Sequence, residues 1–337
     1  MNNISEVGAQ ELTVLMPAFN SGRYIAQAIC SILSQTYTNY KFIVLDDGSD
    51  DDTGEIISEF AKIDSRIIYI KNDENRGVLY SRQILSDMVD TEFFTWMDAD
   101  DISPADRIQL QIDTIRSSPK LVAVGGYNKY FGDKDIICLS PCDPDDIKAA
   151  LLVGNVMTMP SVIRTSAFRQ SGFSFLNCNV DSAEDYAMWS SLVRHGDIKN
   201  LPMVVNFYRR HETQESTKFI ERQNTMAKKI MVKMFSNINV MISDDIRHCI
   251  RLFPGETATI DEVFSVAKLY TEAMLKNKEI KFFNEKSLKR HLANSFRRHC
   301  KMLGGYGVLV FIYYFGGVEF FRGDKYGLSF VKYCFGK

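Results

Sequence analysis

An excess of charge of either sign is missing from this sequence. Its 40 lysine and arginine residues nearly balance its 42 aspartate and glutamate residues, which gives a formal net charge of -2 at pH 7. Proteins that bind nucleic acid in general do so through strongly basic surfaces. We therefore expect no nucleic-acid partner.

Cysteine is also scarce, with seven residues scattered along the chain. An odd, scattered set does not suggest a disulfide framework, so we expect reduced thiols in a cytoplasmic protein. Cys138 and Cys142 lie four apart without a second cysteine pair, which argues against zinc. The opening stretch, "MNNISEVGAQELT", is polar, so the sequence predicts no secretory signal.

Two phosphate-binding motifs are absent as well. No GxxxxGK[ST] pattern occurs, and no GxGxxG follows the first predicted strand. These absences exclude a P-loop NTPase and an ordinary dinucleotide enzyme. With 45% hydrophobic and 24% charged residues, the 337-residue chain has the composition of an ordinary folded protein.

Strand and helix patterns alternate through the first part of the chain. Apolar runs typical of buried parallel strands lie at residues 12–19, 41–45, 66–72 and 92–97. Each is followed by helical spacing, at residues 21–35, from about 52, 77–89 and 104–117. This alternation predicts an α/β fold, a mostly parallel sheet flanked by helices. From about residue 217 the pattern is helical, with amphipathic segments at 217–235, 261–276 and 284–303.

Polar residues gather where these strands end. The stretch "FFTWMDADD", residues 93–101, begins as a buried strand and ends with three aspartates. Acidic turns can simply cap helices, but four strand ends converge on the ligand-binding edge of a parallel sheet. The residues at these ends are Pro17, Phe19, Asn20, Asp46, Asp47, Asn72, Asn75, Arg76, Asp98, Asp100 and Asp101.

Clustered carboxylates need a positive partner, because they repel one another and are costly to desolvate. A divalent cation supplies that charge, and hard oxygen ligands suit Mg²⁺ or Mn²⁺. Such a metal completes its shell with water and phosphate oxygens. The acids therefore indicate a metal bound together with a nucleotide diphosphate.

Six motifs in order resemble family 2 of the glycosyltransferases, which are inverting enzymes of the GT-A fold that use nucleotide sugars. They span roughly residues 11–216 and read "VLMPAFNSGRYIAQAICSILSQTY", "FIVLDDGSDDDT", "NRGVLYSRQ", "WMDADD", "AEDYAMW" and "YRRHETQES". The resemblance implies a GT-A catalytic domain over residues 1–216, with a nucleotide-sugar half at about 11–120 and an acceptor half at about 121–216. Residues 217–337 form a helical C-terminal region that resembles nothing we can name.

The resemblance also implies roles for single residues. Phe19 stacks on the nucleobase, and Asp47 accepts a hydrogen bond from a base N–H, which favours uracil and a UDP-sugar. Asp98 binds ribose, Asp100 ligates Mn²⁺ or Mg²⁺, and Asp185 is the general base. The remaining implied positions are Pro17, Asn20, Asn75 and Arg82 beside the nucleotide sugar, and His211 near the diphosphate or metal.

Other functions weigh less. A nucleotidyltransferase that makes nucleotide sugars normally carries a Gly-rich basic loop near its start, which "VLMPAFNSGRY" is not. A protein that binds nucleotide sugars without catalysis stays open as an alternative, although Asp98, Asp100 and Asp185 argue against it. The resemblance implies transfer to a hydroxyl of a glycan or lipid-linked acceptor, in the assembly of a bacterial surface polysaccharide.

The last part of the chain suggests a membrane contact. Residues 284–303 place Leu288, Leu292, Phe296, His299 and Leu303 along one helical face and carry a net charge of +5, six basic residues against Glu285. A basic amphipathic helix is typical of membrane-surface binding. Residues 304–321 are apolar but too short to span a bilayer with ease. We expect a peripheral contact at the inner face of the membrane; the alternative is that residues 284–337 cover the catalytic domain or form an interface in an oligomer.

Overall fold

The computed structural model describes residues 10–132, 135–210, 220–248, 250, 251, 253 and 256–302. The chain divides into two compact units. The first unit comprises residues 1–144 and 156–218, and the second comprises 145–155 and 219–337. The change of unit after residue 218 lies close to the expected boundary at 216. Residues 145–155 join the second unit, which no local sequence pattern indicates.

An eight-stranded sheet forms the centre of the first unit. Its strands are β1 (Leu12–Ala18), β2 (Tyr40–Asp46), β3 (Ile67–Lys71), β4 (Phe93–Trp96), β5 (Leu121–Phe131), β6 (Ile136–Cys138), β7 (Val162–Arg164) and β8 (Asp197–Arg209). The order across the sheet is β3-β2-β1-β4-β7-β5-β6, and β8 pairs with β5. Within the described residues, β1 to β4 run parallel, as does β8 with β5, whereas β7 is antiparallel to both of its neighbours.

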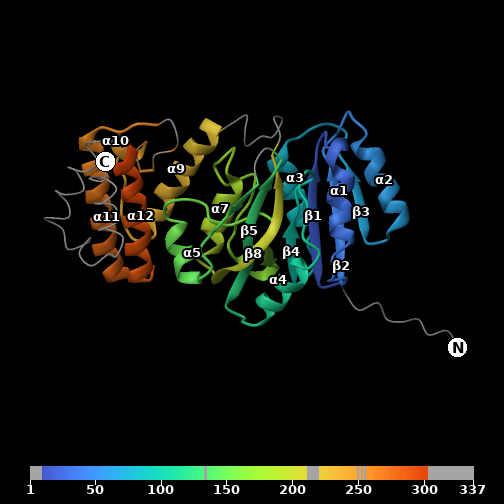
Figure 1. The fold of residues 1–337 in the computed structure, drawn as a ribbon, viewed down its shortest axis with the longest axis horizontal. Coiled ribbons are helices and arrows are strands. Elements are labelled where there is room, and N and C mark those ends of the chain that lie inside the picture. Colours follow the sequence, from blue (N-terminus) through green and yellow to red (C-terminus); the bar gives the residue numbers. More distant parts are fainter. Residues whose placement is uncertain are drawn as a thin grey trace. The chain divides into compact units, whose positions relative to one another are not determined.

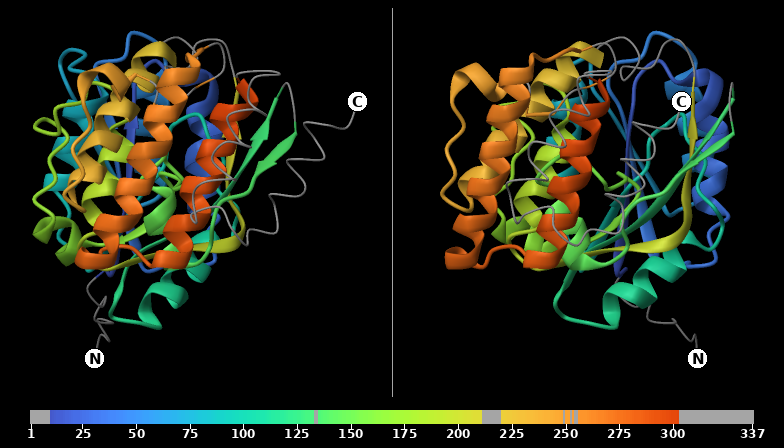
Figure 2. Two further views of the ribbon diagram at one scale, coloured as in Figure 1. Left: turned by 90° about the vertical axis from the view of Figure 1, so that its left-hand side faces the viewer. Right: turned by 60° about the vertical axis from the view of Figure 1, so that its left-hand side comes forward.

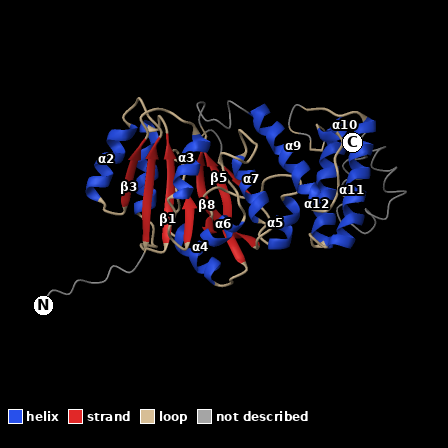
Figure 3. Ribbon diagram, turned by 180° about the vertical axis from the view of Figure 1, so that it is seen from behind, coloured by secondary structure: helices blue, strands red, loops and turns tan. Residues whose placement is uncertain are grey.

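Helices cover both faces of this sheet. They are α1 (Gly22–Leu33), α2 (Thr53–Ile63), α3 (Val78–Asp87), α4 (Arg107–Arg116), α6 (Thr165–Gln170) and α7 (Glu184–Leu192). Alternate residues of β1, such as Val14 and Met16, pack in one buried cluster with apolar residues of α1 and α4. Figure 1 looks onto the face that α1 covers, and Figure 3 onto the face with α3. The predicted α/β fold with a mostly parallel sheet flanked by helices is confirmed.

Aromatic contacts fill the opposite face of the sheet. Phe94 and Trp96 alternate with the residues of β4 that face α4, so they point to the side of α3 and α6. The ring of Trp96 meets the ring of Phe175 edge to face at 5.5 Å, and Phe94 meets Phe168 of α6 at 5.1 Å. Contacts of this geometry add to the stability that apolar burial provides. The strand that precedes the acidic loop is thus fixed on both faces.

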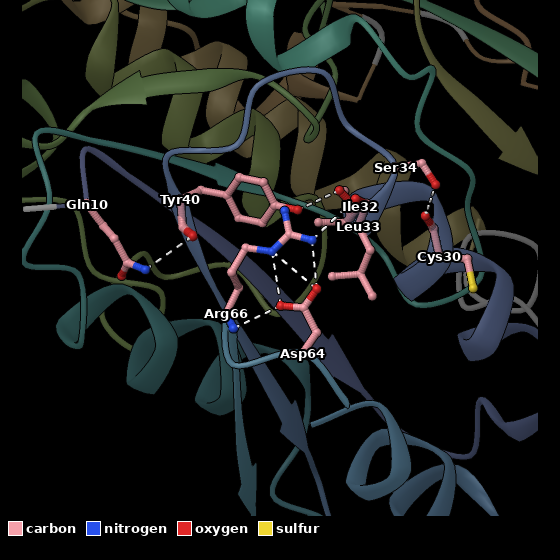
Figure 4. Close-up of polar contacts among 8 residues, drawn as sticks. All are labelled: Gln10, Cys30, Ile32, Leu33, Ser34, Tyr40, Asp64 and Arg66. Carbon is pink, nitrogen blue, oxygen red and sulfur yellow. Dashed lines mark hydrogen bonds and ion pairs between the residues drawn. The ribbon is translucent and has the colours of Figure 1, made fainter. Parts of the chain in front are cut away.

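The amino ends of the strands are closed by self-contained polar contacts (Figure 4). Arg66 donates from Nε and Nη2 to both carboxylate oxygens of Asp64, and its guanidinium lies over the ring of Tyr40 at 4.8 Å. The hydroxyl of Tyr40 donates to the carbonyl of Ile32, and Gln10 donates to the carbonyl of Tyr40. These polar groups pair with one another, so we assign this edge of the sheet a structural role and not a ligand-binding one.

Four described helices and α5 make up the second unit. They are α5 (Pro144–Ala150), α9 (Ile220–Ser236), α10 (Asp244–Arg247), α11 (Ile260–Ile280) and α12 (Glu285–Met302). Helices α11 and α12 lie side by side, in orange and red in Figure 2. Tyr270 of α11 shares a hydrogen bond with Ser295 of α12 at 2.9 Å. At the end of α11, Asn277 exchanges two hydrogen bonds with the backbone of Phe283 and so closes the turn into α12.

The predicted basic amphipathic helix forms as α12, but its apolar side is buried. Leu288, Leu292, Phe296 and His299 are each at most 1% exposed, so they are not available to a lipid surface. Leu303 and residues 304–321 lie outside the described residues. Among the helices that the structure describes, none combines the length and the apolar character needed to cross a bilayer.

Candidate active site

An acidic loop follows β4 at the carboxyl edge of the sheet. It comprises Asp98, Ala99, Asp100 and Asp101. The carboxylate of Asp101 is buried and accepts hydrogen bonds from the side-chain amide of Asn206 at 2.7 Å and from the backbone N–H of Arg209 at 2.9 Å. The end of β8 is thereby attached to the loop. Asp101 therefore has a structural role in the site. Asp98 and Asp100 are more exposed to solvent than Asp101.

Arg209 fastens the same loop a second time. Its Nε donates to the carbonyl of Asp100 at 2.8 Å, and its Nη2 donates to Gln27 of α1 at 2.7 Å. The guanidinium also lies over the rings of Tyr24 and Phe131, each at 4.6 Å. Because four neighbours hold its guanidinium, this arginine fixes where the backbone of Asp100 lies.

The acidic loop is held at a cost in electrostatic energy. Burial raises the pKa of Asp98, and the carboxylates of Asp100 and Glu184 raise it further against the effect of Arg82. Burial, Asp98 and Asp100 together hold the pKa of Asp101 well above its ordinary value. Burial is the largest cause in both cases, and the close spacing of the carboxylates adds to it. A group of this kind is typical of a functional site.

Arg82 of α3 connects the loop to helix α7. Its Nη2 donates to Asp98 at 3.1 Å, and its Nε lies 3.5 Å from a carboxylate oxygen of Glu184. The guanidinium is 6% exposed and lies over the ring of Trp96 at 5.3 Å. The family resemblance implies a place for Arg82 beside the nucleotide. In the structure it lies between two carboxylates, with Nε and Nη1 making no hydrogen bond within the described residues.

Asp185 lies in the first turn of α7, one residue beyond Glu184. Burial raises the pKa of its carboxyl group to about 6, with the charge of Glu184 as the next cause. The backbone N–H of Tyr186 donates to it at 2.6 Å, which opposes the rise together with Arg82. A carboxylate with this pKa is still ionised at pH 7 and is a much stronger base than an ordinary aspartate. It has the properties of a general base.

The loops after β1 and β2 are joined at the neighbouring strand ends. The backbone N–H of Asn20, which has a positive φ of 45°, donates to the hydroxyl of Ser49, and Asn20 accepts from the N–H of Asp50. Pro17 lies within β1, opposite Leu45 of β2. The ring of Phe19 between these loops is 42% exposed, so one face is open to a ligand.

Asp47 organises the loop after β3. It accepts hydrogen bonds from the side chain of Asn72 at 2.6 Å and from the backbone N–H groups of Arg76 at 3.1 Å and Gly77 at 2.8 Å. Asn75 lies in this loop and accepts from the same N–H of Gly77. Gly48 must be a glycine, because its φ is +71° and a Cβ there would lie 2.6 Å from the backbone of Glu74.

Sequence reasoning places most of these residues at one edge but misses two. The structure connects Arg82, Asp98, Asp100 and Asp185 through contacts or electrostatic interactions, while Pro17, Phe19, Asn20, Asp47 and Asn75 line the adjacent loops. Their assigned roles stay predictions. Asn206 and Arg209 were not singled out, although an asparagine and an arginine at the end of an apolar strand could have suggested them. His211 lies outside the described residues.

The acidic loop fits a divalent cation that binds with few protein ligands. Within the described part of the chain, no three His, Cys, Asp or Glu side chains form a ready ligand cluster. Asp98 and Asp100, which are both partly exposed, supply hard carboxylate oxygens. Mg²⁺ and Mn²⁺ suit one or two carboxylates with phosphate and water in the other positions.

Comparisons with known proteins agree with this geometry. The profile of the family "Glycosyl transferase family 2" matches residues 13–171. An uncharacterized glycosyltransferase of Haemophilus influenzae is 32% identical over 231 residues, which cover 65% of this chain and 71% of that protein. WfaP of Escherichia coli, a UDP-Glc:alpha-D-GlcNAc-diphosphoundecaprenol beta-1,3-glucosyltransferase, is 28% identical over 71% of this chain and 95% of its own length.

The fold has a counterpart among solved structures. TarS 1–349 of S. aureus, crystallised with UDP-GlcNAc, superposes with a TM-score of 0.55 at 14% identity, over 97% of this chain and 92% of that one. This likeness extends the agreement from the sequence to the arrangement of the sheet and its helices. The chain belongs to glycosyltransferase family 2, and it is a glycosyltransferase with a GT-A fold.

Proposed function

We propose that this enzyme transfers a sugar from a UDP-sugar to a hydroxyl group of a glycan or lipid-linked acceptor, with inversion at the anomeric carbon. The observation that carries the proposal is the place of Asp185. It combines a pKa near 6 with a position on the helix that Arg82 connects to Asp98. The proposed base would therefore lie next to the edge that is proposed to bind the nucleotide. Residues 11–120 would bind the donor, and residues 121–216 the acceptor.

The loops after β1 and β2 would bind the nucleoside. Phe19 offers an exposed ring on which a base can stack. The two oxygens of Asp47 accept three hydrogen bonds from the chain, two at Oδ1 and one at Oδ2. Because a carboxylate has about four acceptor positions, one remains at Oδ2 for a base N–H. Uracil supplies such an N–H, which favours UDP over other nucleotides.

The acidic loop would hold the diphosphate end. Asp98 would bind ribose, and Asp100 would ligate Mn²⁺ or Mg²⁺, with His211 as a further candidate ligand. When bound, the metal supplies Lewis-acid stabilisation of the leaving diphosphate. Arg209 and Asn206 contribute by fixing the loop backbone, so that the carboxylate of Asp100 is presented without reorganisation.

The reaction would proceed as a single displacement. Asp185 takes the proton of an acceptor hydroxyl. The electron pair left on the acceptor oxygen then forms a bond to the anomeric carbon. The bond between that carbon and the diphosphate oxygen breaks on the opposite face, and the UDP leaves with the bond's electron pair. An α-linked donor thus gives a β-linked product. Proton removal by a positioned base contributes about 10²–10⁴-fold to such a rate.

The acceptor is proposed from the relatives and not from the site residues. WfaP is named for a diphosphoundecaprenol acceptor, and the match to this chain covers 95% of the length of WfaP. A lipid-linked acceptor would place the enzyme at the cytoplasmic face of the membrane, as a peripheral protein. Contact would come from the exposed cations of α12, such as Lys286 and Arg298, because the apolar side of that helix is buried. Anionic lipid adds about 1 kcal/mol per nearby cation.

A donor panel tests the proposal. The enzyme is incubated with UDP-, GDP- and dTDP-sugars and Mn²⁺, with and without a lipid-linked N-acetylglucosamine diphosphate acceptor, and released nucleotide is measured. UDP release that increases with acceptor, together with a β linkage in the product by NMR, supports the proposal. Release that is equal for all nucleotides removes the case for uridine, and an α linkage removes the case for a single displacement.

A further inference from the structure

Arg107 is an unusual residue for the first turn of a helix. It is 0% exposed and is among the largest fully buried side chains in the described residues. No carboxylate pairs with it there, and burial lowers the pKa of its guanidinium to about 9. The group is nevertheless charged at pH 7. A buried charge without a counterion is costly, and apolar side chains of similar size are often at least as stable in such places.

Arg107 donates hydrogen bonds to residues that precede and follow the acidic loop in the sequence. Its Nε donates to the hydroxyl of Ser103 at 2.7 Å, just after the loop, and its Nη1 donates to the hydroxyl of Thr95 at 2.9 Å, just before it. The same Nη1 donates to the carbonyl of Pro160 at 3.2 Å. Pro160 lies two residues before β7, the strand that pairs with β4. One guanidinium therefore reaches both ends of the loop and the adjacent strand.

None of these partners depends on Arg107 alone. Ser103 also accepts a hydrogen bond from Gln35 at 3.0 Å, and the carbonyl of Pro160 also accepts from Gln111 at 2.9 Å. The hydroxyl of Thr95 lies 3.5 Å from the carbonyl of Trp96. Removing the guanidinium would thus leave few buried groups unpaired. Nη2 of Arg107 makes no hydrogen bond within the described residues, so pairing alone does not account for a buried guanidinium at this place.

We propose that Arg107 is a positioning residue, which holds the two ends of the acidic loop at the separation that a metal–diphosphate complex requires. The proposal rests on the proposed function, because it takes the loop to bind that complex. Arg107 touches neither substrate nor metal. It acts through Thr95 and Ser103, and Arg209 and Asn206 fix the loop from the side of β8.

Calorimetric titration of the full chain with UDP, with and without Mn²⁺, tests this role. Arg107→Met removes the hydrogen bonds while filling the volume. Supporting residues of metal sites typically change affinity by about 10–100-fold, and we expect a loss of at least about tenfold in the affinity for UDP with Mn²⁺. The number of sites per chain and the unfolding temperature should stay near their wild-type values. Arg107→Lys keeps the charge but can reach fewer partners, so its affinity for UDP with Mn²⁺ should lie between those of the wild type and Arg107→Met.

Two further variants separate the contacts of Arg107. Ser103→Ala removes one loop contact and should weaken UDP binding with Mn²⁺ in the same direction. Gln111→Met is the matched control for the Pro160 contact: Gln111 donates to the same carbonyl and accepts from Nη1 of Arg107 at 3.5 Å, but it makes no hydrogen bond to Thr95 or Ser103. It should leave that affinity unchanged. If Arg107→Met does not fold, the Arg107→Lys and Ser103→Ala titrations still decide the question.

The outcomes distinguish the inference from the proposed function. Wild-type affinity in Arg107→Met, or an unchanged affinity with fewer sites per chain, would show that the residue is merely structural and would overturn the inference. A loss in Gln111→Met equal to that in Arg107→Met would overturn it as well. Failure of the wild-type protein to bind UDP more tightly with Mn²⁺ would instead overturn the metal–diphosphate part of the proposed function.

Discussion

Replacing Asp185 by asparagine should inactivate the enzyme and stabilise it at the same time. The folded protein holds the pKa of Asp185 at about 6, against 3.8 for an unperturbed aspartate. Above pH 6 the ionised group is therefore disfavoured by folding. One pKa unit corresponds to about 1.36 kcal/mol, so the penalty is at most about 3 kcal/mol at pH 8. Part of the carboxylate stays in contact with water, and we expect a gain of about 1–3 kcal/mol in the variant.

The sign and the pH range of this effect follow from linkage. As pH falls through 6 the folded form takes up a proton, while the unfolded form remains ionised until about pH 3.8. The advantage of Asp185→Asn should therefore shrink below pH 6, to about half its full value at pH 5, and should nearly vanish at pH 4. The amide oxygen of asparagine can still accept from the N–H of Tyr186, so the helix start is preserved.

Urea denaturation at pH 8 and pH 5 measures the stability difference, and product formation measures transfer. An amide cannot accept the proton, so kcat should fall by about 10²–10⁴-fold, while UDP affinity should stay near that of the wild type. Asp113→Asn is the control, because Asp113 is an exposed carboxylate on α4 whose loss should change stability by less than about 0.5 kcal/mol at either pH. A variant that is less stable at pH 8, or a gain that is equal at both pH values, would refute the reasoning.

Three further predictions concern the same edge of the sheet. The kcat/KM of the wild type should fall as pH drops through about 6. Glu184→Gln should move that decline to lower pH, because the charge of Glu184 raises the pKa of Asp185. If the decline in the pH–rate profile of Glu184→Gln stays where it is in the wild type, Asp185 is not the group that titrates. Asp100→Ala should lower transfer about a thousandfold or more, measured as released UDP, and full wild-type activity in excess EDTA would contradict the metal role of Asp100. Phe19→Ala should weaken UDP binding by about 0.5–1.5 kcal/mol in calorimetry, and equal affinities of the wild type for UDP and GDP would remove the uridine preference.

Local sequence patterns are sufficient for the parallel part of the fold. A strand buried on both faces needs a continuous apolar run, and a covering helix needs apolar residues at helical spacing. Strands β1, β2 and β4 and their helices can therefore be recognised one at a time, and the partly exposed β3 still shows a short apolar run. The carboxyl-edge rule then gathers the acids without any knowledge of side-chain contacts. This explains why Asp98 and Asp100 could be chosen from the residue pattern, whereas Asp185 was implied only by the family resemblance and the shape of the surroundings was not indicated at all.

The contacts that span long sequence distances leave no such signal. Strand β8 pairs with β5, 76 positions earlier when Asp197 is matched with Leu121, and only this pairing brings Asn206 and Arg209 to Asp101. Arg107 has the sequence context of an exposed residue at a helix start, and its burial depends on a carbonyl 53 residues away. The side-chain partners of the loop therefore required the structure.

Aspartate residues at the two edges of the sheet have pKa values shifted in opposite directions. At the amino ends, Arg66 donates hydrogen bonds to Asp64 and holds the pKa of that carboxyl group below its usual value. At the carboxyl ends, burial and neighbouring carboxylates raise the pKa of Asp98 and Asp185. An edge built for stability alone would have its charges neutralised, as the first one does. The second holds buried carboxylates close together with raised pKa values, which is typical of a functional site.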